Sequence, residues 1–245
     1  MINKILETYR NHHIVVVGNG GTGSNLVPHL CQWAYSVQEK EKISITLADE
    51  DIVEPSNIGR QFFIEPEVGK NKAKMLQRRY HRAWNVNVSY YPYYIREAES
   101  LIKLLKPPAC HNGQATLVIL VSCVDNHFSR RIFHKVFYKL DDMIYLDAGN
   151  AEFHGQVVMG MRFQGKTLLK PLGEIDPNVY EEQDEIEVGG TCNREVIKQP
   201  QNLLANLWAA TVLLTFLNNI VALKDVPIWR TMFSGHTTRS KPIYA

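Results

Sequence analysis

The six residues Gly18-Asn19-Gly20-Gly21-Thr22-Gly23 have the spacing of a turn that binds phosphate. Glycines allow a tight turn and let backbone N–H groups approach an anion closely. The apolar run 14–17 before the turn predicts a strand, and residues 24–38 after it predict a helix. A helix that begins there directs its partly positive end at the anion. This stretch therefore predicts a nucleotide-binding strand–turn–helix unit, although its spacing fits NAD, FAD and ATP proteins alike.

Acidic residues follow two other stretches that have the pattern of strands. Residues 43–48 alternate in polarity and end at Asp49-Glu50-Asp51, and the apolar run 117–121 leads to Asp125. Ligands of an open parallel sheet bind at the edge formed by the carboxyl ends of its strands. The first acidic cluster is therefore placed to accept hydrogen bonds from ribose hydroxyls, with a solvated turn as the alternative. We expect Asp125 at the same edge as the Gly-rich turn.

The predicted elements alternate as strand, helix, strand, helix and strand. This order predicts an α/β fold with a Rossmann-like, doubly wound and mostly parallel sheet. From residue 155 the pattern changes, and 156–163 predicts an antiparallel extension toward the carboxyl terminus. We expect one domain over residues 1–245, with its nucleotide-binding half at about 12–150 and its second half at about 151–245.

The stretch 203–217 is almost wholly apolar, but its length of about 15 residues is short of the roughly 20 that span a bilayer. It predicts a buried helix that packs on the sheet or on a second subunit. We therefore expect no membrane partner. The pattern of the tail, 227–245, predicts no role for it.

Composition narrows the class of protein. The chain has 245 residues with a net charge of +2, which gives no reason to expect a nucleic-acid partner. Its four cysteines form no C-x-x-C pair, so neither a zinc ribbon nor a secreted disulfide scaffold is expected. The first residues lack the apolar core of a signal peptide, and we expect a cytoplasmic location.

A longer set of motifs is more specific than the Gly-rich turn. The motifs occur in the order Gly18-x-Gly-Gly-x-Gly23, Asp49-x-Asp51, Ser56-Asn57-x-x-Arg60-Gln61, Gly69-x-x-Lys72 and Asp125-Asn126. Over residues 12 to 222 this set resembles the ThiF/MoeB/HesA family, the adenylation domains related to ubiquitin-activating enzymes. Within that family the chain looks most similar to the short ThiF-type members of bacterial PRTRC cassettes.

The resemblance implies an enzyme that uses ATP and Mg²⁺ to adenylate the carboxyl terminus of a small ubiquitin-like or sulfur-carrier protein ending in Gly. It also implies a homodimer, a crossover loop and a partner-binding second half. The attacking carboxylate is already anionic, so the enzyme must position two anions and neutralise phosphate charge rather than supply a base.

The resemblance also assigns roles to individual residues. Asp49 would hold the ribose, and Asp125 would bind Mg²⁺. The phosphates would be contacted by the turn around Gly21, by Asn57 and by the catalytic residues Arg60 and Lys72. The other residues implied in nucleotide binding are Gly18, Gly20, Gly23, Asp51, Ser56 and Asn126.

Cys192 is the candidate for a second chemical step. In the family, a Thr-Cys element after the crossover loop can carry an acyl-thioester or persulfide step, and Thr191-Cys192 matches that place. An accessible thiolate could attack the acyl adenylate, whereas a buried structural cysteine is the alternative. The zinc-binding Cys pairs of many members are missing from this sequence, which is a departure from the family pattern.

Two other functions remain open at this point. An NAD- or FAD-dependent oxidoreductase would share the Gly-rich turn, but it would not need Arg60, Lys72 and Asp125. A non-catalytic nucleotide-binding scaffold could keep the fold without the reaction.

Overall fold

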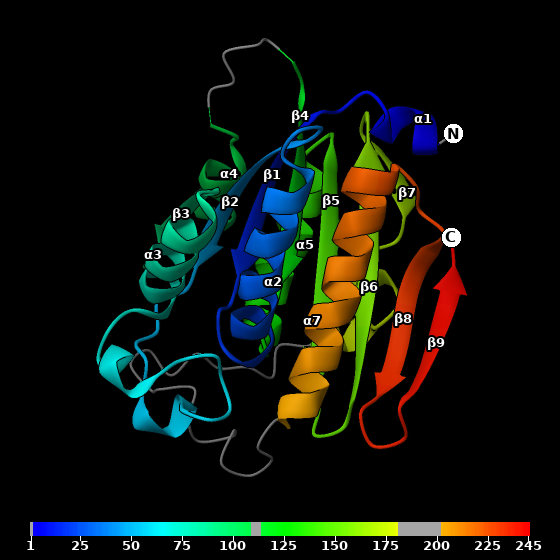
Figure 1. Cartoon of the computed structure of the whole chain (residues 1–245). Helices are drawn as coiled ribbons and strands as arrows, with labels where there is room; N and C mark the ends of the chain where they lie inside the picture. The colour runs from blue at the N-terminus through cyan, green and yellow to red at the C-terminus, as the bar shows by residue number, and fades with distance from the viewer. Residues whose placement is uncertain (1, 109–113, 181–201) are drawn as a thin grey trace.

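The computed structural model describes residues 2–108, 114–180 and 202–245, which form a nine-stranded sheet with helices on both faces (Figure 1). The strand order is β3-β2-β1-β4-β5-β6-β8-β9, and β7 pairs with β6. The parallel strands are β1 (Asn11–Val17), β2 (Lys42–Ala48), β3 (Asn87–Tyr91), β4 (Thr116–Ser122) and β5 (Met143–Asn150). The antiparallel strands are β6 (His154–Phe163), β7 (Lys166–Leu169), β8 (Ile228–Ser234) and β9 (Arg239–Tyr244). The predicted Rossmann-like sheet with an antiparallel extension is confirmed.

The helices divide between the two faces of the sheet (Figure 1). One face carries α2 (Gly21–Val37), α3 (Lys72–Trp84) and α7 (Leu203–Asn218), and the short α1 (Ile2–Leu6) packs on the same core. The other face carries α4 (Ala98–Leu105) and α5 (His127–Lys139). The single helical turns are η1 (Pro55–Asn57), η2 (Glu65–Glu67), η3 (Leu172–Glu174), η4 (Pro177–Tyr180) and the π-helical η5 (Asn219–Leu223).

Strand β1 is buried along its whole length because helices cover both of its faces. Ile14 and Val16 belong to the core under α2 and α7, whereas Val15 and Val17 belong to the core under α4 and α5. A strand with two buried faces reads as a continuous apolar run, as in other parallel sheets. The central position of β1 places the Gly-rich turn that follows it in the middle of the sheet edge.

The predicted buried helix is confirmed as α7, which lies beside α2 on the sheet (Figure 1). Together α7 and η5 make a stretch of 21 residues that passes a test for membrane spans by length and composition alone. Half of its apolar stretch is buried inside the protein. The indole of Trp33 in α2 donates a hydrogen bond of 3.0 Å to Asn218, which joins the two helices near their ends.

The tail, for which the sequence predicts no role, forms β8 and β9 and completes the antiparallel extension. Its polarity does not alternate cleanly, and Pro242 reads as a strand breaker, although proline is tolerated in an edge strand such as β9. A capping residue sets the start of α3. Asn71 caps this helix by accepting a hydrogen bond from the backbone N–H of Lys74, so the helix begins at Lys72.

Two glycines let the start of α2 pack tightly against the sheet. Gly18 has a φ of 85°, and a Cβ there would lie 2.8 Å from the carbonyl oxygen of Cys123. A Cβ on Gly23 would overlap the carbonyl oxygen of Gly18. The turn and the first helical turn therefore have no room for a side chain at either position.

We expect Gly23→Ala to lower the free energy of unfolding by about 3 kcal/mol, because an overpacked methyl group forces the backbone to shift. Gly235→Ala is the matched control, since the nearest atoms to a Cβ there lie at an ordinary 3.6 Å. Urea unfolding followed by circular dichroism measures both variants. Equal unfolding midpoints for the two variants would contradict this packing.

Candidate active site

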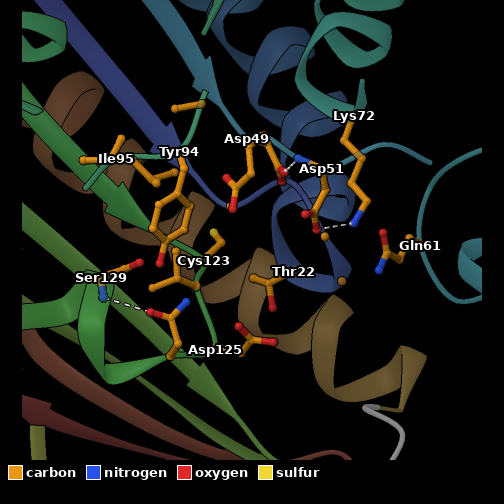
Figure 2. A pocket seen from close by; sticks show the side chains of 18 of the residues that line it. Thr22, Asp49, Asp51, Gln61, Lys72, Tyr94, Ile95, Cys123, Asp125 and Ser129 are labelled. Carbon is orange, nitrogen blue, oxygen red and sulfur yellow. Dashed lines mark hydrogen bonds and ion pairs between the residues drawn. The ribbon is translucent and has the colours of Figure 1, made fainter. Parts of the chain in front are cut away.

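The carboxyl ends of β1, β2, β4 and β5 border a cavity of about 470 Å³. Side chains from the loops after these strands converge on it (Figure 2). The predicted site residues that line it are Gly18, Gly20, Gly21, Asp49, Asp51, Asn57, Arg60, Lys72, Asp125 and Asn126. Gly23 and Ser56 do not line it, because Gly23 packs against Gly18 and Ser56 is exposed on η1. Cys192 lies outside the described residues.

The amino terminus of α2 forms the centre of the cavity wall. Gly20, Gly21 and Thr22 line the cavity, and the helix begins at Gly21. The N-cap residue Gly20 has no side chain that could satisfy the first N–H groups of the helix. Such groups, together with the helix dipole, suit an anion such as a phosphate.

Asp49 is a buried carboxylate at the end of β2, held by two backbone donors. It accepts hydrogen bonds from the N–H groups of Asn19 and Asp51. Burial, and next the nearby charge of Asp51, raise the pKa of Asp49 to about 6. Burial also raises the pKa of the neighbouring Glu50 to about 7. Both groups thus titrate close to neutral pH, which is unusual for carboxylates and typical of functional sites.

Lys72 carries its charge into the cavity from the first turn of α3, where its side chain is largely buried. Its Nζ lies 2.9 Å from Oδ2 of Asp51, whose side chain is about half exposed (Figure 2). Lys72 therefore already has an anionic partner, for which a bound phosphate would compete. Arg60 also lines the cavity, in the loop after η1.

Two predicted ligand-binding asparagines also have structural tasks. Oδ1 of Asn57 accepts a hydrogen bond of 3.0 Å from the N–H of Glu54 and closes the η1 turn. Oδ1 of Asn126 accepts one of 2.8 Å from the N–H of Ser129 and caps α5 (Figure 2). The amide N–H donors of each asparagine take no part in these two bonds.

Asp125 is exposed on the β4 side of the cavity. Among residues 2–108, 114–180 and 202–245, no cluster of three or more His, Cys, Asp or Glu side chains could hold a metal ion. A single carboxylate nevertheless suits Mg²⁺, which is commonly held by one or two carboxylates together with substrate phosphates and water. The donor set therefore fits a magnesium ion that is bound jointly with a nucleotide.

Arg130 borders the cavity but is held by the protein itself. Its Nε donates to Oδ1 of Asp147 at 3.1 Å, and its guanidinium also donates to the carbonyl oxygens of Val124 and Ala148. The guanidinium thus joins the loop after β4 to the end of β5. This arrangement indicates a structural role.

Glu50 of the predicted acidic cluster also lines the cavity. The structure adds lining residues that the sequence reasoning missed: Tyr93, Tyr94, Ile95, Cys123, Ser129, Gly149 and Asn150. Tyr93 and Tyr94 make one part of the lining aromatic, and Figure 2 shows the ring of Tyr94. Tyr94 stacks on Phe128 with an angle of 10° between the rings. The sequence could have predicted Tyr93 and Tyr94 as lining residues, because they follow β3 and the carboxyl end of β3 lies at the same edge of the sheet. Burial raises the pKa of the Cys123 thiol, which argues against a thiolate there.

The chain is similar to known proteins in sequence and in fold. A family model described as ThiF family matches residues 2–234. The PaaA structure is 18% identical, with a TM-score of 0.66 over 98% of this chain and 65% of PaaA. The structure of E. coli MccB with ATP is 18% identical, with a TM-score of 0.64 over 98% of this chain and 65% of MccB. No curated protein matches the sequence.

A further structure similar to this chain is the microcin C7 biosynthetic enzyme MccB in complex with N-formylated MccA. It is 19% identical, with a TM-score of 0.66 over 98% of this chain and 66% of that chain. The chain thus spans about two thirds of the length of these structures. At these identities the likeness establishes the fold.

We expect the affinity for ATP to fall as the pH is lowered through 6, because protonation removes the ionised Asp49 that would accept ribose hydroxyls. With a pKa of about 6, Asp49 is about nine-tenths protonated at pH 5, so the affinity falls about tenfold from pH 7.5. Calorimetric titration at the two pH values measures this change.

Two variants isolate Asp49 from other titrating groups. Asp49→Asn should show only the weaker pH dependence that ATP itself contributes, whereas Glu50→Gln should keep most of the wild-type dependence. The role of Asp49 would be refuted by equal pH dependence in the wild type and Asp49→Asn.

Proposed function

The chain belongs to the ThiF family, and we propose that it activates a carboxylate by adenylation with ATP. One observation carries the proposal. A single cavity joins an uncapped helix terminus, a buried carboxylate at the end of β2, the cationic side chains of Arg60 and Lys72, and the exposed carboxylate of Asp125. The likeness of the fold to MccB, which has been seen with ATP, supports the same proposal.

The proposed reaction needs few chemical groups from the protein. A carboxylate oxygen of the acceptor attacks the α-phosphorus of ATP, the bond to the bridging oxygen breaks, and pyrophosphate leaves. The product is a mixed anhydride between the acceptor and AMP. No proton moves in this step, so the protein contributes by holding the two anions in line and by neutralising phosphate charge.

The described residues divide these tasks. Asp49 orients the ribose, and the N–H groups at the start of α2 hold the phosphates. Arg60 and Lys72 face the departing pyrophosphate, and Lys72 exchanges its bond with Asp51 for one with phosphate. A magnesium ion, held by Asp125 and phosphate oxygens, would supply further charge neutralisation.

The acceptor that we propose is the carboxyl terminus of a small ubiquitin-like or sulfur-carrier protein that ends in Gly. This proposal rests on the sequence motifs shared with the ThiF/MoeB/HesA family. MccB has been seen with N-formylated MccA, which supports a peptide or protein acceptor in general. The homodimer and the PRTRC and cytoplasmic assignments stay predictions.

We expect Asp125→Ala to reduce ATP–pyrophosphate exchange about 100-fold or more, as when other preorganised charge-stabilising groups are removed. The assay uses the full chain with a panel of small ubiquitin-like proteins ending in Gly. Asp141→Ala is the matched control, since Asp141 is an exposed aspartate away from the cavity. Full exchange by Asp125→Ala, or tight binding of NAD without binding of Mg·ATP, would refute the active-site assignment.

We expect Cys192→Ala to leave the exchange reaction largely intact but to abolish any adduct with the acceptor that a thiol reductant releases. Adenylation requires no thiol, whereas a thioester or persulfide step does. Non-reducing electrophoresis of reaction mixtures, with Cys31→Ala as the control for a buried cysteine, measures the adduct. An adduct that persists in Cys192→Ala would assign the nucleophile to another residue or protein.

A further inference from the structure

Three polar side chains meet beside the Gly-rich turn, each from a different element. They are Thr22 at the start of α2, Asn150 at the end of β5 and Asn206 in the first turns of α7. Oδ1 of Asn206 accepts hydrogen bonds from Nδ2 of Asn150 at 2.8 Å and from Oγ1 of Thr22 at 3.3 Å. The Thr22 hydroxyl also lies 3.2 Å from Oδ1 of Asn150. These hydrogen bonds connect α7 to the start of α2 and to the end of β5.

Asn206 is fully buried on the packed side of a helix whose other buried residues are alanine, valine, leucine and phenylalanine. Burying an amide costs free energy unless its hydrogen bonds are made, and its Nδ2 has no partner among the described residues. A Cβ on Gly21 would lie 2.5 Å from this nitrogen, so the Gly-rich turn leaves the space that the amide fills. An apolar side chain would fit this helix face better than an amide, which indicates that Asn206 is there for its hydrogen bonds.

Of the three residues in the cluster, Asn150 and Thr22 line the cavity. Asn150 is half-buried, and its contacts with Asn206 and Thr22 fix the orientation of its amide. An asparagine amide has two N–H donors, and only one of them is used by Asn206. The second donor is available to a ligand in the cavity.

The order of the strands places Asn150 opposite the cationic side chains. Asp49 and Asp51 follow β2, and Asp51 binds Lys72, whereas Asn150 ends β5 on the other side of β1 and β4. Strands in a sheet are spaced about 4.8 Å apart, so β2 and β5 lie about 14 Å apart. Phosphates on the α2 terminus would lie between the two sides.

In-line displacement requires the nucleophile to enter opposite the leaving group. If the departing pyrophosphate faces Arg60 and Lys72, the acceptor carboxylate enters from the β5 side, where Asn150 lies. The guanidinium of Arg130 on that side is already bound by Asp147 and two carbonyl oxygens. A neutral amide orients a carboxylate with weaker hydrogen bonds than a free cation would, and so lowers its nucleophilicity less.

We propose that Asn150 forms the subsite for the acceptor's terminal carboxylate, with Asn206 and Thr22 as positioning residues that hold its amide. This proposal rests on the proposed adenylation. In the product state the same N–H donates to the acyl carbonyl oxygen of the mixed anhydride. The subsite thus recognises the acyl group that distinguishes the acyl adenylate from AMP.

The test compares two probes on the full chain by calorimetry: AMP and 5′-O-(N-acetylsulfamoyl)adenosine, a stable mimic of an acyl adenylate. The wild type is expected to bind the acylsulfamate more tightly than AMP. Asn150→Ala should lose about fivefold of the affinity for the acylsulfamate, as for one neutral hydrogen bond, and keep its affinity for AMP. Asn87→Ala, which removes an exposed asparagine on β3, is the matched control.

Two substitutions of Thr22 distinguish a positioning role of its hydroxyl from a packing role of its side chain. Thr22→Val keeps the shape of the side chain and the backbone N–H but removes the hydroxyl, so it should lose part of the preference for the acylsulfamate over AMP. Thr22→Ser keeps the hydroxyl and should therefore keep the preference. Asn206→Ala should resemble Asn150→Ala, and the Thr22 pair decides the question should that variant fail to fold.

The outcomes distinguish this inference from the proposed function. A wild-type preference for the acylsulfamate that persists in Asn150→Ala and in Thr22→Val would overturn the subsite and leave adenylation standing. A wild type that binds neither AMP nor the acylsulfamate would overturn both.

Discussion

The close packing of the Gly-rich turn against the ends of β1 and β4 determines the geometry of the cavity. Gly18 lies against the carbonyl of Cys123, and Gly23 lies against the carbonyl of Gly18. Because neither position has room for a side chain, the amino terminus of α2 stays at the edge of the sheet with its N–H groups directed into the cavity. The side chains that follow β2, β4 and β5 then surround this terminus.

Some of the charges in the cavity are paired before any ligand binds. The buried Asp49 and the partly exposed Asp51 are offset by Lys72, and Arg130 is offset by Asp147. Burying charges costs free energy unless they are paired, and this pairing keeps the site stable while leaving Lys72 able to exchange partners. Burial, and next the charge of Asp51, raise the pKa of Asp49 even though Lys72 is close by. Such partial pairing of charges suits a site that receives a polyanion together with its own cation.

Sequence reasoning found the parts of the site that local patterns mark. The turn Gly18–Gly23, Asp49 and Asp125 follow apolar runs directly, so the sheet topology alone brings them to one edge. It did not find Asn206, which lies about 180 residues after its partner Thr22 in a helix that reads as apolar core. Nor did it find β8 and β9, whose pairing with β6 depends on contacts distant in sequence.

A crystal structure of the chain with the α,β-methylene analogue of ATP would test the central claim, that this cavity holds ATP for attack by a carboxylate. The account predicts the ribose hydroxyls on Asp49 and the triphosphate over Gly20 to Thr22. The β- and γ-phosphates should face Arg60 and Lys72, with the α-phosphorus open toward Asn150. A triphosphate bound away from the start of α2, or one whose terminal phosphates face Asn150, would contradict it.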